Sequence, residues 1–116
     1  MKEEMLRRTK RFAIDCWSFC SKVPKSREYN AYVNQLIRSS SSVGANYRAA
    51  QRAKSTRDFI NKLKIVEEEA DESLYWLELF EEIKNDFKKK IQPLRKEGGE
   101  LLAITVASIN TAKRNK

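Results

Sequence analysis

The sequence predicts an all-α protein that folds as a single domain over residues 1–116. Three observations lead to this class. Only three Gly and two Pro occur in the chain, which leaves few turns for joining strands. Hydrophobic residues make up 41% and charged residues 34%, a balance typical of a globular domain rather than of a disordered chain or a membrane protein. Apolar residues recur every three or four positions in four segments, which is the spacing of helices that bury one side.

The first predicted helix runs from about Glu3 to Lys22, and Pro24 ends it because proline cannot continue the hydrogen-bond ladder. Two cysteines lie one turn apart in this helix, a spacing that suits two reduced core thiols better than a disulfide. The apolar stripe consists of Met5, Thr9, Phe12, Cys16, Phe19, Cys20 and Val23.

The second predicted helix starts after Ser26, a plausible N-cap, and continues to about Arg52. One side of it is expected in the core: Tyr29, Val33, Leu36, Ser40, Tyr47 and Gln51. The other side carries small residues, Ser42, Ala45 and Ala49, where a solvent-facing helix normally carries Lys and Glu. An exposed Ser/Ala patch is one interpretation; we favour a helix packed on both sides, within the subunit and against another subunit.

The third predicted helix begins at a capping box, Ser55-Thr56-Arg57-Asp58. Its core stripe is Phe59, Leu63, Val66, Ala70, Leu74 and Leu77, and its flanking stripe is Ile65, Glu69, Glu72, Trp76, Ile83 and Phe87. The two carboxylates in the flanking stripe either reach water at its edge or are neutralised by another helix. We predict the second: Arg38 pairs with one of them inside the bundle, because a guanidinium stays charged when desolvated. The polar network is expected to comprise Arg38, Ser39, Asn46, Glu69 and Glu72.

The fourth predicted helix begins between Lys88 and Gln92, and Pro93 favours the later start because proline is tolerated best in a first turn. Leu94, Leu101, Leu102, Thr105, Ile109 and Ala112 form its core side. Ala103, Val106 and Ala107 leave the opposite side apolar as well. Two helices without a polar back indicate self-association, and the predicted oligomer interface is Ser42, Ala45, Ala49, Ala103 and Val106.

The chain contains no histidine, which excludes Ser-His-Asp and Cys-His catalysis and His-ligated zinc. Glu69 and Glu72 alone make a weak metal or acid–base pair because no second carboxylate motif accompanies them. We therefore expect no catalytic residue, no metal, no cofactor and no enzymatic activity. The aromatic residues lie on helical seams and are assigned to the core rather than to base stacking.

The net charge of +8 is unevenly distributed. Residues 55–83 carry nine acidic and three basic side chains, whereas the segments on either side are basic. This pattern fits binding of a polyanion, and it fits equally a protein whose acidic helix neutralises its basic neighbours. The candidate nucleic-acid-binding residues are Arg7, Arg11, Arg48, Arg52, Lys113 and Arg114. No segment is long and apolar enough for a membrane span, and none resembles a signal peptide, so a cytoplasmic location is expected.

Several segments carry a family resemblance. Residues 35–47, Gln-Leu-Ile-Arg-Ser-Ser-Ser-Ser-Val-Gly-Ala-Asn-Tyr, resemble the second-helix signature of the small proteins encoded in intervening sequences of bacterial 23S ribosomal RNA genes. The likeness continues through Asp58-Phe59 with Lys62, Glu69-Ala70 with Glu72, Tyr75-Trp76-Leu77-Glu78-Leu79, and Leu101-Leu102 with Ile109. It covers nearly the whole chain. Many members have an Asn-x-x-Glu-Gly pattern, whereas here Ala49 and Ala50 follow Arg48.

The resemblance implies an up-down-up-down four-helix bundle and a homopentamer. A related protein is the accessory protein of diversity-generating retroelements, a basic pentamer thought to bind nucleic acid and a reverse transcriptase. We therefore expect a non-enzymatic oligomeric bundle that binds RNA or DNA through a basic surface, with a reverse transcriptase as a candidate partner. The alternative is a protein-interaction scaffold whose charges serve solubility alone.

Overall fold

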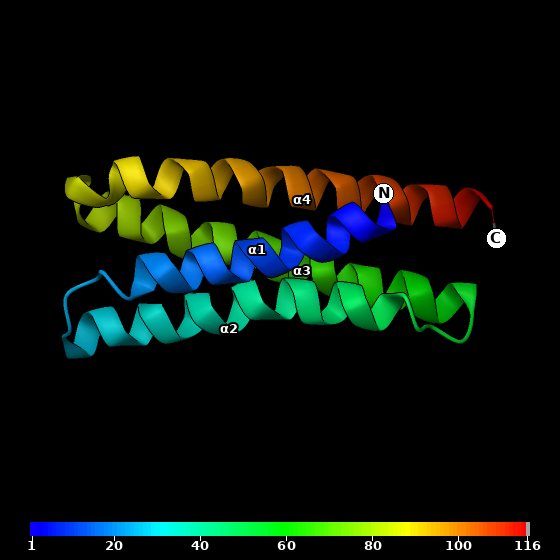
Figure 1. Cartoon of the computed structure of the whole chain (residues 1–116), viewed down its shortest axis with the longest axis horizontal. Helices are drawn as coiled ribbons and strands as arrows, with labels where there is room; N and C mark the ends of the chain where they lie inside the picture. The colour runs from blue at the N-terminus through cyan, green and yellow to red at the C-terminus, as the bar shows by residue number, and fades with distance from the viewer. Residues whose placement is uncertain (116) are drawn as a thin grey trace.

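The computed structural model describes residues 1–115 and shows four long antiparallel helices (Figure 1). These are α1 (Lys2–Cys20), α2 (Arg27–Ala50), α3 (Thr56–Ile83) and α4 (Lys88–Arg114), with a short 3₁₀ helix, η1 (Asn85–Phe87), before α4. Successive helices reverse direction, so the up-down-up-down bundle predicted for this sequence is confirmed. The bundle measures 47 × 21 × 20 Å, and both ends of the described chain lie at the same end of it.

Each helix packs against two neighbours. Helix α1 contacts α2 and α4, and α3 contacts the same two helices from the other side. Helices α1 and α3 are therefore diagonal, as are α2 and α4. The outer face of α3 consequently points away from α1, which matters for the distribution of charge described below.

Serine side chains cap two helices as predicted. Ser26 Oγ accepts a hydrogen bond from the Tyr29 amide at 3.0 Å, and Ser55 Oγ accepts one from the Asp58 amide at 3.0 Å. The Asp58 carboxylate accepts from the amide of Lys54 at 3.3 Å rather than from that of Ser55, so the capping box is complete on its serine side only. Each cap satisfies an amide that the helix itself leaves free.

The core follows the predicted stripe of the first helix closely: all seven stripe residues are buried, six of them on α1 and the seventh, Val23, just after it. On α3 the buried stripe is centred on Ile60 and Ser73 rather than on Phe59 and Leu74, which are partly buried beside it. Ile83, expected in the flanking stripe, is 51% exposed. An aromatic cluster fills the core at the end of the bundle that holds the α1–α2 and α3–α4 connections, with ring centroids 5.4–6.4 Å apart: Phe19, Tyr29, Phe80 and Phe87.

Two glycines mark close approaches between helices. A Cβ on Gly44 of α2 would lie 3.3 Å from Thr9 Oγ1 of α1. A Cβ on Gly98 of α4 would lie 2.9 Å from Leu74 Cδ2 and 3.2 Å from the Phe12 ring. The absence of a side chain at these positions lets α1 lie close to its neighbours.

Helix α4 starts earlier than Pro93 indicates. It begins at Lys88, which makes Pro93 the sixth residue of the helix. The predicted preference for a later start was therefore wrong. Phe87 and Ile91 are buried and anchor the first turn to the core. The hydrogen bond that Pro93 cannot donate would have gone to the carbonyl of Lys89, an exposed residue whose carbonyl water can solvate.

Candidate nucleic-acid groove and polar network

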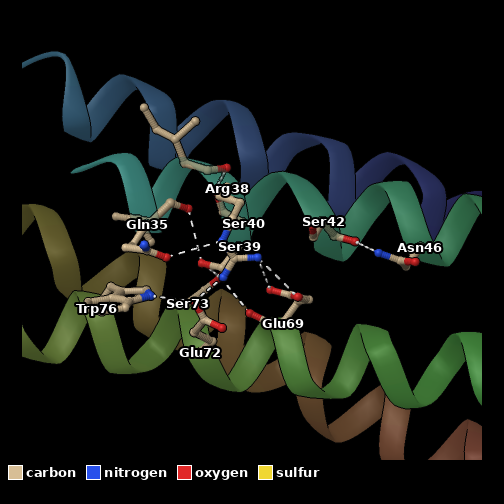
Figure 2. A network of polar contacts seen from close by, with 12 residues as sticks. Gln35, Arg38, Ser39, Ser40, Ser42, Asn46, Glu69, Glu72, Ser73 and Trp76 are labelled. Carbon is tan, nitrogen blue, oxygen red and sulfur yellow. Dashed lines mark hydrogen bonds and ion pairs between the residues drawn. The ribbon is translucent and has the colours of Figure 1, made fainter. Parts of the chain in front are cut away.

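Arg38 of α2 reaches across to α3 and contacts two carboxylates (Figure 2). Its Nη1 lies 3.2 Å from Glu69 Oε1, and its Nη2 donates to Glu72 Oε2. Trp76 Nε1 also donates to Glu72 Oε2, at 3.0 Å. These bonds hold the pKa of the Glu72 carboxyl below its ordinary value, the Trp76 bond having the largest effect and the Arg38 bond adding to it.

The predicted pairing of Arg38 is present, but its side chains are more exposed to solvent than predicted. The Arg38 side chain is 47% exposed, that of Glu69 19% and that of Glu72 35%. The guanidinium crosses the surface between α2 and α3 instead of lying inside the bundle. The expectation of a dry, buried pair is therefore corrected to a partly solvated one.

Two buried serines, one on α2 and one on α3, lie beside the ion pair (Figure 2). The hydroxyls of Ser39 and Ser73 are fully buried and hydrogen-bonded at 2.9 Å, and Ser73 also donates to the Glu69 carbonyl at 2.8 Å. Asn46, a predicted member of this network, lies apart from it: its Nδ2 donates to the Ser42 carbonyl one turn back. The network thus joins α2 to α3 through Arg38 and Ser39.

Two further arginines join helices and were missed in the sequence. Arg8 of α1 binds Glu97 of α4 with two hydrogen bonds, at 2.7 and 2.9 Å, and Glu100 at 2.8 Å. Arg95 of α4 binds Glu81 of α3 at 2.6 Å. Helical periodicity places these residues near the edges of their apolar stripes, but it does not give the register between neighbouring helices that pairs them.

A groove of about 730 Å³ lies between α1 and α2. Three of the predicted nucleic-acid-binding residues, Arg7, Arg11 and Arg48, line it, together with Lys10, which the sequence analysis missed. Arg52 lies just beyond the end of α2, and Lys113 and Arg114 at the end of α4, all at the end of the bundle that holds the α2–α3 connection. The structure therefore brings half of the predicted set into one groove and leaves the other half at the bundle's end.

The groove has an apolar floor and a basic rim. Four exposed cationic side chains surround it, and one carboxylate, that of Glu3, lies at its end. Arg11 also contacts Asp15 on its own helix, at 3.2 Å. The floor consists of Leu6, Thr9, Ala13, Ile14, Ser41, Gly44 and Ala45.

The acidic stripe of α3 lies on a different face from this groove. Its exposed carboxylates belong to Glu68, Asp71, Glu78 and Glu82. Helix α3 is diagonal to α1, and none of these four carboxylates lines the groove. Among the residues that line it, the four cationic side chains accompany a single carboxylate, that of Glu3.

The predicted interface residues do not form one surface. Ala45 is exposed in the floor of the groove, among the arginines, and Ser42 and Ala49 are half-buried on α2. Ala103 is exposed and Val106 half-buried on α4, which is diagonal to α2.

The assignment of all aromatic residues to the core was wrong for Trp17 and Tyr75, which are 60% and 55% exposed. The helical spacing already contained this signal for Trp17, since it lies outside the apolar stripe of α1. No helix within residues 1–115 has the length and apolar character needed to cross a membrane.

Comparison with known proteins adds a family and a fold. Residues 1–107 match the family described as 23S rRNA-intervening sequence protein. The structure is similar to the crystal structure of a protein with unknown function from the S23 ribosomal protein family, from Bacteroides thetaiotaomicron, with a TM-score of 0.86 and 29% sequence identity. That similarity covers 95% of this chain and 99% of the other. No curated protein matches the sequence.

Proposed function

The chain belongs to the family of 23S rRNA-intervening sequence proteins, and we propose that it is a non-enzymatic oligomeric bundle that binds RNA or DNA. The observation that carries this proposal is the groove between α1 and α2, where Arg7, Lys10, Arg11 and Arg48 gather around one concave surface. Clustered cations on a concave surface focus a positive field and attract polyanions.

Phosphates are the groups that this groove binds. Arg7, Lys10 and Arg48 form no ion pair within residues 1–115, whereas Arg8, Arg38 and Arg95 are engaged between helices. Unpaired cations release counterions from a nucleic acid when they contact its phosphates, and this release makes binding strong at low salt. The contacts carry little sequence information because base edges take no part in them.

We propose that copies of the chain contact one another through two surfaces that carry little charge. One is the outer face of α4, with Ala103 and Val106, and the other is the part of α2 that carries Ser42 and Ala49. A ring of five copies, the number implied by the family resemblance, would repeat the basic groove and raise the avidity for one long polyanion. A reverse transcriptase is the partner suggested by the same resemblance. The alternative function, a scaffold for protein interactions with no nucleic-acid role, is favoured if the groove proves inert.

Fluorescence anisotropy with labelled RNA and DNA, single-stranded and duplex, tests the proposal. Four phosphate contacts on a duplex give a slope of log affinity against log salt of about −3.6. Binding should therefore weaken roughly 100-fold between about 50 and about 200 mM salt. The triple variant Arg7→Glu, Arg11→Glu, Arg48→Glu should abolish binding at low salt.

The matched control reverses three exposed lysines at the other end of the bundle, Lys25→Glu, Lys84→Glu and Lys89→Glu, and so changes the net charge by the same amount. This control should retain most of the affinity. Equal losses in both triple variants would show that only total charge matters, and the absence of binding to every probe at low salt would leave the scaffold as the function.

A further inference from the structure

Trp17 is an exposed aromatic side chain in line with the basic groove. It lies one turn beyond Ile14 on α1, on the side of the helix that also carries Arg7, Lys10 and Arg11. Trp17 is 60% exposed, and within residues 1–115 it makes none of the ring–ring contacts that the other aromatic residues make with one another. Ile14 is 44% exposed beside it. Trp is highly buried on average in folded proteins, so a Trp and an Ile exposed next to each other at one end of a basic groove indicate a contact surface for a ligand.

The apolar floor of the groove distinguishes between two forms of nucleic acid. A duplex presents phosphates on its outside and keeps the faces of its bases stacked within, so it would contact the rim and leave the floor wet. A single strand can turn its bases toward Ile14, Ala45 and the Leu6 side chain while its phosphates contact the rim. Positive grooves combined with aromatic platforms are the usual means of binding single strands.

We propose that the groove between α1 and α2 binds a single-stranded segment of RNA or DNA, with one base stacked on Trp17. This inference rests on the proposed nucleic-acid function and adds the form of the ligand and the residue that selects it. Arg7 and Trp17 are ten residues apart, about 15 Å along a helix. At the ~3.4 Å spacing of stacked nucleotides, that length corresponds to a site of about four nucleotides.

A second copy of the chain fits the groove less well. The acidic outer stripe of α3 is opposite in charge to the basic rim. Between Glu68 and Glu82, however, its only large exposed apolar side chain is that of Tyr75. Such a stripe would press carboxylates against the apolar floor and leave that floor unfilled. Nucleobases provide flat apolar faces together with the phosphates that the rim requires.

The test uses the fluorescence of Trp17 alone, which the Trp76→Phe variant isolates because the chain has only two tryptophans. The probes are an oligouridylate, its deoxy counterpart, a duplex of equal length, and an abasic oligomer that keeps the phosphates but lacks bases. Stacking should quench Trp17 with both single strands and leave it unchanged with the abasic oligomer. The two single strands should also bind more tightly than the duplex and the abasic oligomer.

Trp17→Ala should weaken single-strand binding about 5- to 150-fold, the usual effect of removing one stacking side chain, and Trp17→Phe should restore most of it. Tyr75→Ala is the matched control, since it removes a similarly exposed aromatic side chain from the acidic face and should leave single-strand binding unchanged. Because Trp17 is exposed, circular dichroism and Tm should stay near those of the wild type.

The outcomes separate this inference from the function on which it rests. If abasic and normal oligomers bind equally and Trp17→Ala has no effect, while the arginine variants still lose binding, phosphate binding stands and the single-strand inference is overturned. If no probe binds at low salt, both fall together. If Trp17→Ala lowers the mass of the particle in light scattering, the tryptophan is a contact between copies, and the inference is likewise overturned.

Discussion

Arg38 links α2 to α3 by holding two carboxylates at a surface that water still reaches. Removing one partner of a dry ion pair costs ~3–5 kcal/mol, whereas an exposed pair contributes at most ~1 kcal/mol. With its side chain 47% exposed and two carboxylates in contact, Arg38 lies between these limits. We expect Arg38→Ala to lower the free energy of unfolding by about 1–2 kcal/mol, a fall in Tm of roughly 5–10 °C.

Thermal unfolding at a single protein concentration measures the Tm of this variant and of a control, Arg27→Ala. The Arg27 side chain is 95% exposed, so the control should have the same Tm as the wild type. If Arg38→Ala also has the same Tm as the wild type, solvent screens the ion pair completely.

The sequence identified the Arg38 contact because both partners stood out within their own helices: an arginine among small residues, and carboxylates within an apolar stripe. It did not identify Arg8 with Glu97 or Arg95 with Glu81, because all four residues look like ordinary surface charges. Their pairing depends on the rotation and axial register of one helix relative to another, and these are set by packing of the whole core. Trp17 differs from these residues: its position outside the apolar stripe of its own helix indicates exposure without any knowledge of the neighbouring helices.

At the scale of the helix, adjacent glycines in α4 offer a matched comparison. A Cβ at Gly98 would press on Leu74 and on the buried Phe12 ring, whereas one at Gly99 meets nothing within 4 Å. Alanine is favoured over glycine in a helix by up to ~1 kcal/mol, and overpacking a core costs ~1–3 kcal/mol. Gly99→Ala should therefore raise the free energy of unfolding by about 0.5–1 kcal/mol, and Gly98→Ala should lower it by about 1 kcal/mol.

Chemical denaturation of both variants measures the difference. Equal stability of the two would mean that Leu74 and Phe12 yield to the added methyl group without cost. A destabilised Gly99→Ala variant would indicate that another molecule covers this face of α4.

Helix ends were predicted well where local chemistry decides them and poorly where the core does. Ser26 and Ser55 cap the helices that they were predicted to cap, because the hydrogen bond from a backbone amide to a serine hydroxyl lies within three residues. The start of α4 instead follows from the burial of Ile91 and from the packing of Phe87 against Phe19 of α1 and Phe80 of α3, which outweigh the single hydrogen bond lost at Pro93. Local rules cannot weigh that contact because its partners are distant in sequence.

At the scale of the molecule, the separation of charge leaves two faces with different properties. The basic groove lies between α1 and α2, and none of the exposed carboxylates of α3 is among its lining residues, so the acidic stripe and the basic groove are separate surfaces. Composition alone made polyanion binding and internal neutralisation equally good interpretations. This separation favours polyanion binding over internal neutralisation, and it could not be deduced from the sequence because the arrangement of helices around the bundle is a tertiary property.

The proposed ring is tested on the outer face of α4. Ala103 is exposed in the single chain, so Ala103→Arg should leave the helical fold intact while placing a large charge in any contact between copies. Light scattering should give the wild type a mass near five times 13.6 kDa and should give this variant a much smaller one. Ala45→Arg is the matched comparison: Ala45 lies in the floor of the groove, so this substitution should leave the mass unchanged while adding a cation to the groove. A wild type that is monomeric at micromolar concentration would contradict the ring. Loss of assembly in Ala45→Arg alone would assign the groove to the contact between copies and leave Arg52, Lys113 and Arg114, at the end of the bundle, as the basic residues still available to a nucleic acid.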